Sequence, residues 1–123
     1  MALSKKDKII REKAIRILKF ILEKKAEKPV LLDLRKLDFV WDYFIICSAN
    51  SSPHLEAIYE TVIKKAKEYN IEIHHTELDG ESKWILVDFF DIILHIFSQE
   101  ARSFYDLEHL WKEAKKISWK KFL

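Results

Sequence analysis

The chain has 123 residues, of which 49% are hydrophobic and 34% charged, so it can bury its own core and is not a disordered polyampholyte. One Gly, two Pro and one Cys exclude collagen-like folds, disulfide frameworks and cysteine-based zinc folds. Residues 1–28 carry 10 Lys/Arg against 4 Asp/Glu, and residues 112–123 carry 5 Lys against 1 Glu. Because the net charge of the whole chain is only +2, the residues between these two basic ends are net acidic. An acidic body favours a basic protein partner over a nucleic-acid duplex.

The N-terminal third is predicted to form one helix followed by two strands. Apolar residues recur at helical spacing from Ile10 to Ile21. Pro29 disfavours helix in the residue before it, so we expect the helix to end ahead of it. Residues 30–34 and 43–47 are short apolar runs, which predict two strands, and the second run is apolar on both faces.

The middle of the chain is predicted to hold a second helix and a half-exposed strand. Ser52 is the expected N-cap, because Pro53 suits the first turn of a helix. An apolar stripe from Leu55 to Ala66 predicts the buried side of this helix. Residues 71–76 alternate apolar and polar side chains, which is typical of a strand with one face in solvent.

The C-terminal third is predicted to form a hairpin and a last helix. Residues 84–89 and 92–97 are strand-like runs, and Phe90 and Asp91 between them leave room only for a tight turn. The only glycine suggests another hairpin turn at Asp79-Gly80. The expected final helix is marked by the apolar residues Phe104, Leu107, Leu110, Trp111 and Ala114.

These elements in order predict an α/β (α+β) fold with a single mixed five-stranded sheet packed with helices. We expect one domain over residues 1–115 and a basic C-terminal tail over residues 116–123. No apolar run approaches the roughly 20 residues of a membrane span. Residues 1–10 lack the apolar segment of a secretion signal, so we expect a cytoplasmic protein.

The cysteine and histidine residues of the sequence give little indication of a catalytic nucleophile or of a metal site. Cys47 lies in an apolar run, so we expect it to be buried and unreactive. His74 and His75 are adjacent, and adjacent residues of a strand face opposite sides, so they cannot hold one ion without help from elsewhere. His95 lies inside a strand-like run, where a structural histidine is expected. We therefore predict no metal site.

Nucleotide chemistry also lacks its usual signals. The chain has no Gly-rich loop, and the helix start at Ser51 and Ser52 offers only a weak phosphate cradle. Asp88 and Asp91 are three residues apart across a turn, and nothing else completes a two-metal triphosphate site. With Glu77 they are read as turn and surface charges. We predict no catalytic residue and no cofactor.

Several segments together resemble the ribosomal silencing factor (Iojap) family. The matching segments are Asp42–Ile46 with Ser51 and Ser52, Trp84–Asp88, Asp91–Phe97 and Glu100–Trp111, in the family's order and spacing. The last of these mixes aromatic and charged residues, as protein–protein hot spots do. The chain departs from the family pattern at Ala49, Leu78 and Phe90, where the family usually has glycine.

The resemblance implies a fold similar to nucleotidyltransferases without their activity. It also implies a translational repressor that binds a basic ribosomal protein on the joining face of the large ribosomal subunit and sterically blocks the small subunit. Three alternatives remain: a role in large-subunit assembly, a nucleotidyltransferase-like enzyme using Asp88, Asp91 and the helix start at Ser51 and Ser52, and an RNA-binding role for the basic ends of the chain. A homodimer is compatible with all of them.

Docking on a basic protein needs an apolar centre with an acidic rim. We expect Trp84, Tyr105 and Leu110 to form the centre. The expected rim is Asp88, Asp91, Glu100 and Glu108, with Arg102 orienting a carboxylate among them.

Overall fold

The computed structural model describes residues 3–79, 81 and 83–123 as one mixed sheet with helices on both faces. The helices are α1 (Lys5–Glu23), α2 (Ser52–Glu68), α3 (Gln99–Tyr105) and α4 (Leu107–Leu110), with short 3₁₀ turns η1 (Arg35–Leu37) and η2 (Trp119–Phe122). The strands are β1 (Glu27–Asp33), β2 (Tyr43–Ala49), β3 (His75–Leu78), β4 (Trp84–Asp88), β5 (Ile92–Ser98) and β6 (Lys115–Lys116).

The sheet has the strand order β3-β4-β5-β2-β1-β6. Strands β2 and β5 are parallel, and every other neighbouring pair is antiparallel. The predicted fold class is therefore confirmed with one more strand than expected, because Lys115 and Lys116 pair with Asp33 and Leu32 at the edge of β1. The two charged residues of β6 carry no apolar pattern from which a strand can be predicted.

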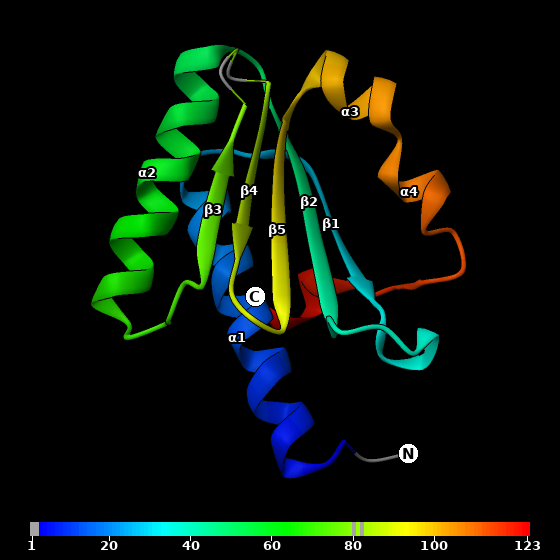
Figure 1. The fold of residues 1–123 in the computed structure, drawn as a ribbon. Helices are drawn as coiled ribbons and strands as arrows, with labels where there is room; N and C mark the ends of the chain where they lie inside the picture. Colours follow the sequence, from blue (N-terminus) through cyan, green and yellow to red (C-terminus); the bar gives the residue numbers. More distant parts are fainter. Residues whose placement is uncertain (1–2, 80, 82) are drawn as a thin grey trace.

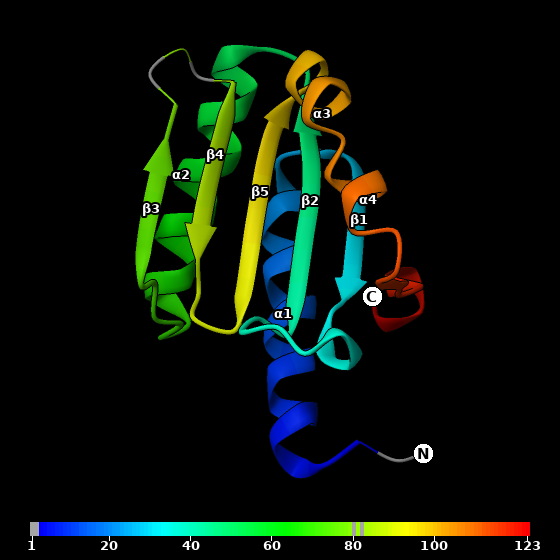
Figure 2. The ribbon, with the colours of Figure 1, turned by 45° about the vertical axis from the view of Figure 1, so that its right-hand side comes forward.

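Helices α1 and α2 lie together on one face of the sheet, as Figures 1 and 2 show from two directions. Their apolar stripes pack on every second residue of the central strands, which matches the alternation of side chains in a strand. The strand residues of this core are Leu31, Tyr43, Ile45, Cys47, Ala49, Ile85, Val87, Ile92, Leu94 and Ile96. We call this side of the sheet the covered face.

Among the described residues, the other side of the sheet carries the short helices α3 and α4, the segment that leads to β6 and the connection around η1, from which Leu37 and Trp41 pack on its cluster (Figure 2). Its buried cluster is smaller and consists of Leu32, Leu34, Phe44, Ile46, Ile93, Phe97, Ala101 and Ala114. Trp84 and Leu86 border this cluster and are only partly buried. We call this side the open face.

Helix and strand ends follow local chemistry. Ser51 caps α2 by accepting a hydrogen bond from the His54 N–H at 3.2 Å, so the N-cap lies one residue before the predicted Ser52. Asn70 follows the helix with φ 57°, the left-handed conformation that ends many helices. β3 starts at His75, four residues later than the alternating pattern suggested. The predicted turn at Asp79-Gly80 includes Gly80, which lies outside the described residues.

The predicted last helix is wrong in one respect, because it is two helices. Asp106 has φ 45°, a left-handed conformation, and this residue ends α3 and begins α4. A residue with positive φ cannot continue a right-handed helix. The break leaves the Phe104 side chain 74% exposed, while Trp111 still packs edge-on against Phe44 with ring centroids 5.2 Å apart.

The basic C-terminal segment packs against the body. Ile117 is buried and its N–H donates to the Leu31 carbonyl at 2.9 Å. The Trp119 indole N–H donates to the Pro29 carbonyl at 3.1 Å. The domain boundary at residue 115 stays a prediction. No helix among the described residues combines the length and apolar character needed to cross a bilayer.

Candidate functional site: the open face of the sheet

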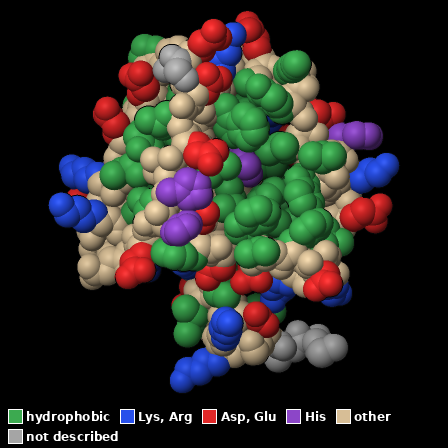
Figure 3. Space-filling model, viewed as in Figure 1, with side chains coloured by type: hydrophobic (Ala, Val, Ile, Leu, Met, Phe, Trp, Pro, Cys, Tyr) green, Lys and Arg blue, Asp and Glu red, His purple; other side chains and the backbone are tan. Residues whose placement is uncertain are grey.

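An aromatic group stands at the centre of the open face. The Trp84 ring lies 4.8 Å from the Tyr105 ring and 4.9 Å from the Phe97 ring, measured between centroids. Phe97 is fully buried, whereas Tyr105 at the end of α3 is 48% exposed. Figure 3 shows hydrophobic side chains gathered over this side of the molecule. A partner can therefore reach an aromatic platform whose base is fixed in the core.

The Trp84 side chain is held by a histidine beneath it. Its indole N–H donates to Nδ1 of His95 at 3.3 Å, and since an indole nitrogen only donates, the proton of the neutral imidazole is on Nε2. Burial lowers the pKa of His95 to about 3, so the ring is neutral near pH 7. Nε2 is buried without a hydrogen-bond partner among the described residues. The imidazole fixes Trp84 at the cost of one unsatisfied donor.

A shallow hollow lies beside Trp84. It has a volume of about 280 Å³ and is lined by Glu77, Leu78, Asp79, Trp84 and Leu86. Leu78 is exposed and Leu86 is half-buried, so the apolar surface continues past the aromatic group toward the β3 edge. Sequence reasoning placed neither leucine nor Asp79 in the docking patch. The alternation along β4 is the signal that places Leu86 on the same side as Trp84.

The structure brings part of the predicted docking set together and separates the rest. Trp84 and Tyr105 are in contact, Glu100 is exposed on α3, and Leu110 on α4 is 70% exposed. Asp88 lies at the opposite end of β4 from Trp84.

Asp91 faces away from the proposed patch. Its carboxylate accepts a hydrogen bond from the Lys13 ammonium on α1 at 3.0 Å, and α1 packs on the covered face. The same ammonium donates to the Phe89 carbonyl at 2.8 Å. A carboxylate engaged in this way is already neutralised, so Asp91 does not join the rim around Trp84.

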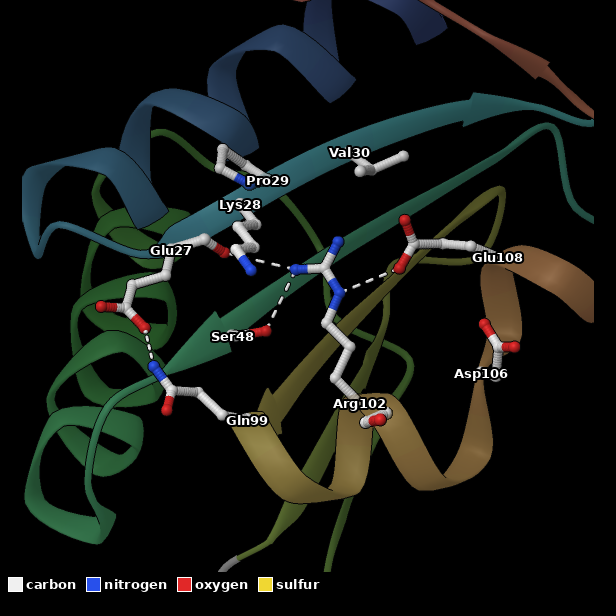
Figure 4. A pocket seen from close by; sticks show the side chains of 10 residues that line it. Glu27, Lys28, Pro29, Val30, Ser48, Gln99, Arg102, Asp106 and Glu108 are labelled. Carbon is white, nitrogen blue, oxygen red and sulfur yellow. Dashed lines mark hydrogen bonds and ion pairs between the residues drawn. The ribbon is translucent and has the colours of Figure 1, made fainter.

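Arg102 is at the centre of a polar pocket between α3 and the strands β1 and β2 (Figure 4). Its Nε donates to the Glu108 carboxylate at 2.9 Å, and its Nη1 donates both to the Ser48 hydroxyl at 3.1 Å and to the Glu27 carbonyl at 3.3 Å. Gln99 donates to the Glu27 carboxylate at 2.6 Å. These groups satisfy one another, so the pocket ties α3 to the sheet, and the charge of Glu108 is compensated within the protein.

Two other predicted groups have definite surroundings. Cys47 is buried as predicted, and burial raises the pKa of its thiol to about 12, so the reactive thiolate is scarce. His74 precedes β3 rather than lying in it, and its ring centroid is 5.1 Å from that of His75. The expectation that the two imidazoles face opposite sides is wrong, because it assumed a strand through both residues.

Comparisons with known proteins agree with this picture of a small sheet domain. The family profile described as "Ribosomal silencing factor during starvation" matches residues 7–122. The curated Ribosomal silencing factor RsfS of Bacillus subtilis is 38% identical over 92 residues, which cover 75% of this chain and 78% of that protein.

Two further relatives extend the comparison. The mouse protein named "Mitochondrial assembly of ribosomal large subunit protein 1" is 33% identical over 73 residues, covering 57% of this chain and 32% of that protein. A crystal structure of a Bacillus halodurans protein superposes with a TM-score of 0.77 at 31% identity, covering 88% of this chain and 98% of that one.

Proposed function

The chain belongs to the ribosomal silencing factor family, and we propose that it docks on the large ribosomal subunit through the open face and blocks joining of the small subunit. The family is named for a regulatory role rather than for a reaction. The observation that carries the proposal is the exposed contact between Trp84 and Tyr105, on the side of the sheet that no long helix covers.

The proposed docking patch has an apolar centre and an acidic border. The centre is Trp84, Leu86 and Tyr105, with Leu78 and Leu110 as its outer members. Glu77 and Asp79 border the hollow beside Trp84, and Glu100 lies on α3. Such a border complements a basic ribosomal protein, and its attraction weakens with salt. Asp88 and Asp91 lie outside this patch for the reasons given above.

Steric occlusion requires no chemistry from the protein. A domain bound at the joining face of the large subunit prevents association by occupying volume, and its affinity rests on a few buried aromatic anchors. The acidic side chains of an enzymatic alternative have other partners: Asp88 accepts from the Phe90 N–H at 2.7 Å and Asp91 from Lys13. Because both carboxylates are engaged within the protein, they give little support to a transferase site. The names of the relatives support a binding role instead.

The test is association of purified bacterial ribosomal subunits on a sucrose gradient. We expect the wild-type protein to co-sediment with large subunits and to reduce joined particles. Tyr105→Ala should weaken large-subunit binding by about 2 kcal/mol or more, roughly thirtyfold, because truncation of a central aromatic is among the most costly changes in an interface.

Tyr69→Ala is the matched control. Tyr69 is 49% exposed, almost the same as Tyr105, but it packs on Phe20 of α1 with ring centroids 5.5 Å apart. The control variant should bind like the wild type. Equal binding by both variants would overturn the proposed patch. Binding to immature large subunits without any effect on subunit joining would favour the assembly role instead.

A further inference from the structure

A cluster of two histidines and an aspartate lies at the outer edge of the sheet. His75 begins β3 and is the register partner of Asp88 at the end of β4, and the His74 N–H donates to the Asp88 carbonyl at 2.7 Å. One ligand-type atom from each of the three side chains lies within 4.8 Å of the others. The backbone of the hairpin therefore holds three metal-ligating side chains at one place.

The spacing within the cluster approaches that of a coordination sphere. Ligand atoms around a tetrahedral zinc ion lie about 3.3 Å apart, given bonds of about 2.0 Å. Nδ1 of His75 is 3.4 Å from Oδ2 of Asp88, so this pair already has the required separation. His74 is exposed, so its side chain is free of the tight packing that would hold the third ligand atom at its present distance.

The groups around the cluster orient its ligands. Oδ1 of Asp88 accepts from the Phe90 N–H at 2.7 Å, which leaves Oδ2 directed at His75. Nε2 of His75 is 3.3 Å from a Glu77 carboxylate oxygen. With Nδ1 on a metal ion, Nε2 carries the proton and donates to Glu77, which is the carboxylate–histidine–metal arrangement that raises ligand basicity. His74 packs on the Phe90 ring with centroids 4.9 Å apart.

We infer that His74, His75 and Asp88 bind a divalent late transition-metal ion, for which Zn²⁺ is the probe. Two imidazole nitrogens and one carboxylate oxygen suit zinc, whereas Mg²⁺ and Ca²⁺ prefer oxygen ligands alone. Three protein ligands leave one tetrahedral position for water or for a side chain of another molecule. Asp88 thus has a function separate from the docking patch in which sequence reasoning placed it.

The experiment is calorimetric titration of the full chain with ZnCl₂ after treatment with a chelator. We expect one saturable site per chain, and His74→Ala and His75→Ala should each weaken binding about tenfold or more. Glu77→Gln should weaken it about tenfold, the size expected for loss of an outer-shell partner. His109→Ala is the matched control, because His109 is an exposed histidine on α4, and it should leave zinc binding unchanged.

Zinc should also raise the thermal midpoint of the wild type and of the control more than that of the two histidine variants at the same zinc concentration, because a ligand that binds only the folded state stabilises it in proportion to its affinity. Circular dichroism of the metal-free variants shows whether they are folded. Absence of saturable binding would overturn the proposal. Equal losses in the His109 variant, unchanged binding in both cluster variants, or equal affinity for Mg²⁺ would overturn it as well.

Discussion

The two faces of the sheet are built from the same strands and differ in what covers them. In β4, Ile85 and Val87 enter the core under α1 and α2, while Trp84 and Leu86 point to the side where only short helices lie. The covered face is closed by helices of 19 and 17 residues, whereas α3 and α4 have 7 and 4. Alternation therefore divides one strand, residue by residue, between the core of the covered face and the proposed docking surface.

The largest expected effect tests this division directly. Ile96→Ala should lower the free energy of unfolding by about 2–5 kcal/mol, because it opens a cavity in the fully buried core of the covered face. Leu86→Ala, on the neighbouring strand and the open face, should cost only about 1 kcal/mol because Leu86 is half-exposed already. Urea denaturation of both variants measures the difference. Equal losses would mean that the open face is as tightly packed as the covered one.

The second effect depends on pH and concerns the histidine under the open face. The folded-state pKa of His95 is about 3, below its ordinary value of 6.5, so the unfolded chain binds the proton more readily. The contribution of His95 to stability is complete above pH 6.5 and is lost as pH falls toward 3, by about 1.4 kcal/mol per pH unit. The neighbouring rings of Phe44, Phe97 and Trp84 carry no charge that offsets this.

The measurement compares stability–pH curves of the wild type and of His95→Leu. The wild type should lose stability relative to His95→Leu as pH falls below 6.5, because only the wild type has the histidine whose pKa is lowered in the folded state. Parallel curves would show that the folded protein protonates the imidazole as readily as the unfolded chain does, and hence that water reaches the open face more deeply than its burial indicates.

The smallest effect concerns the attachment of α3 to the open face. Arg102→Ala should reduce the free energy of unfolding by about 1–3 kcal/mol, because it leaves the Ser48 hydroxyl and the Glu108 carboxylate without their donor. Arg102→Lys should recover less than half of the loss, since one ammonium cannot reproduce the guanidinium fork. Urea denaturation provides the values. If Arg102→Ala left the free energy of unfolding unchanged, apolar contacts alone would hold α3 on the sheet.

Most of the fold could be predicted from hydrophobic periodicity, because α1, α2 and the central strands bury long regular patterns. The break at Asp106 could not, since aspartate adopts positive φ without a sequence signal as clear as glycine. Helix α1 ends ahead of Pro29 as expected, but the strand that follows begins before Pro29 rather than after it. Pro29 lies at a register shift between Glu27 and Val30, where a missing N–H is tolerated. Lys28 before it takes a positive φ of 46°.

The aromatic members of the candidate site could be predicted from the sequence, whereas the partners of its charged residues depend on tertiary contacts and could not. Trp84 and Tyr105 were both predicted as apolar members of the docking centre, and their rings are in contact. Asp91 was chosen for its charge alone, and only the packing of α1 reveals Lys13 beside it. The proximity of His75 and Asp88 could not be predicted, because it follows from the register of β3 against β4, which no local sequence pattern contains.

The two-residue strand β6 has a consequence for the behaviour of the protein in concentrated solution. An unpaired sheet edge is a template on which another chain can add its own strand, and proteins suppress this with short, charged outer strands. Lys115 and Lys116 are exposed there, so a second molecule approaching this edge meets two ammonium groups and very little free backbone. The short, charged strand β6 thereby disfavours the addition of a further strand at this edge of the sheet.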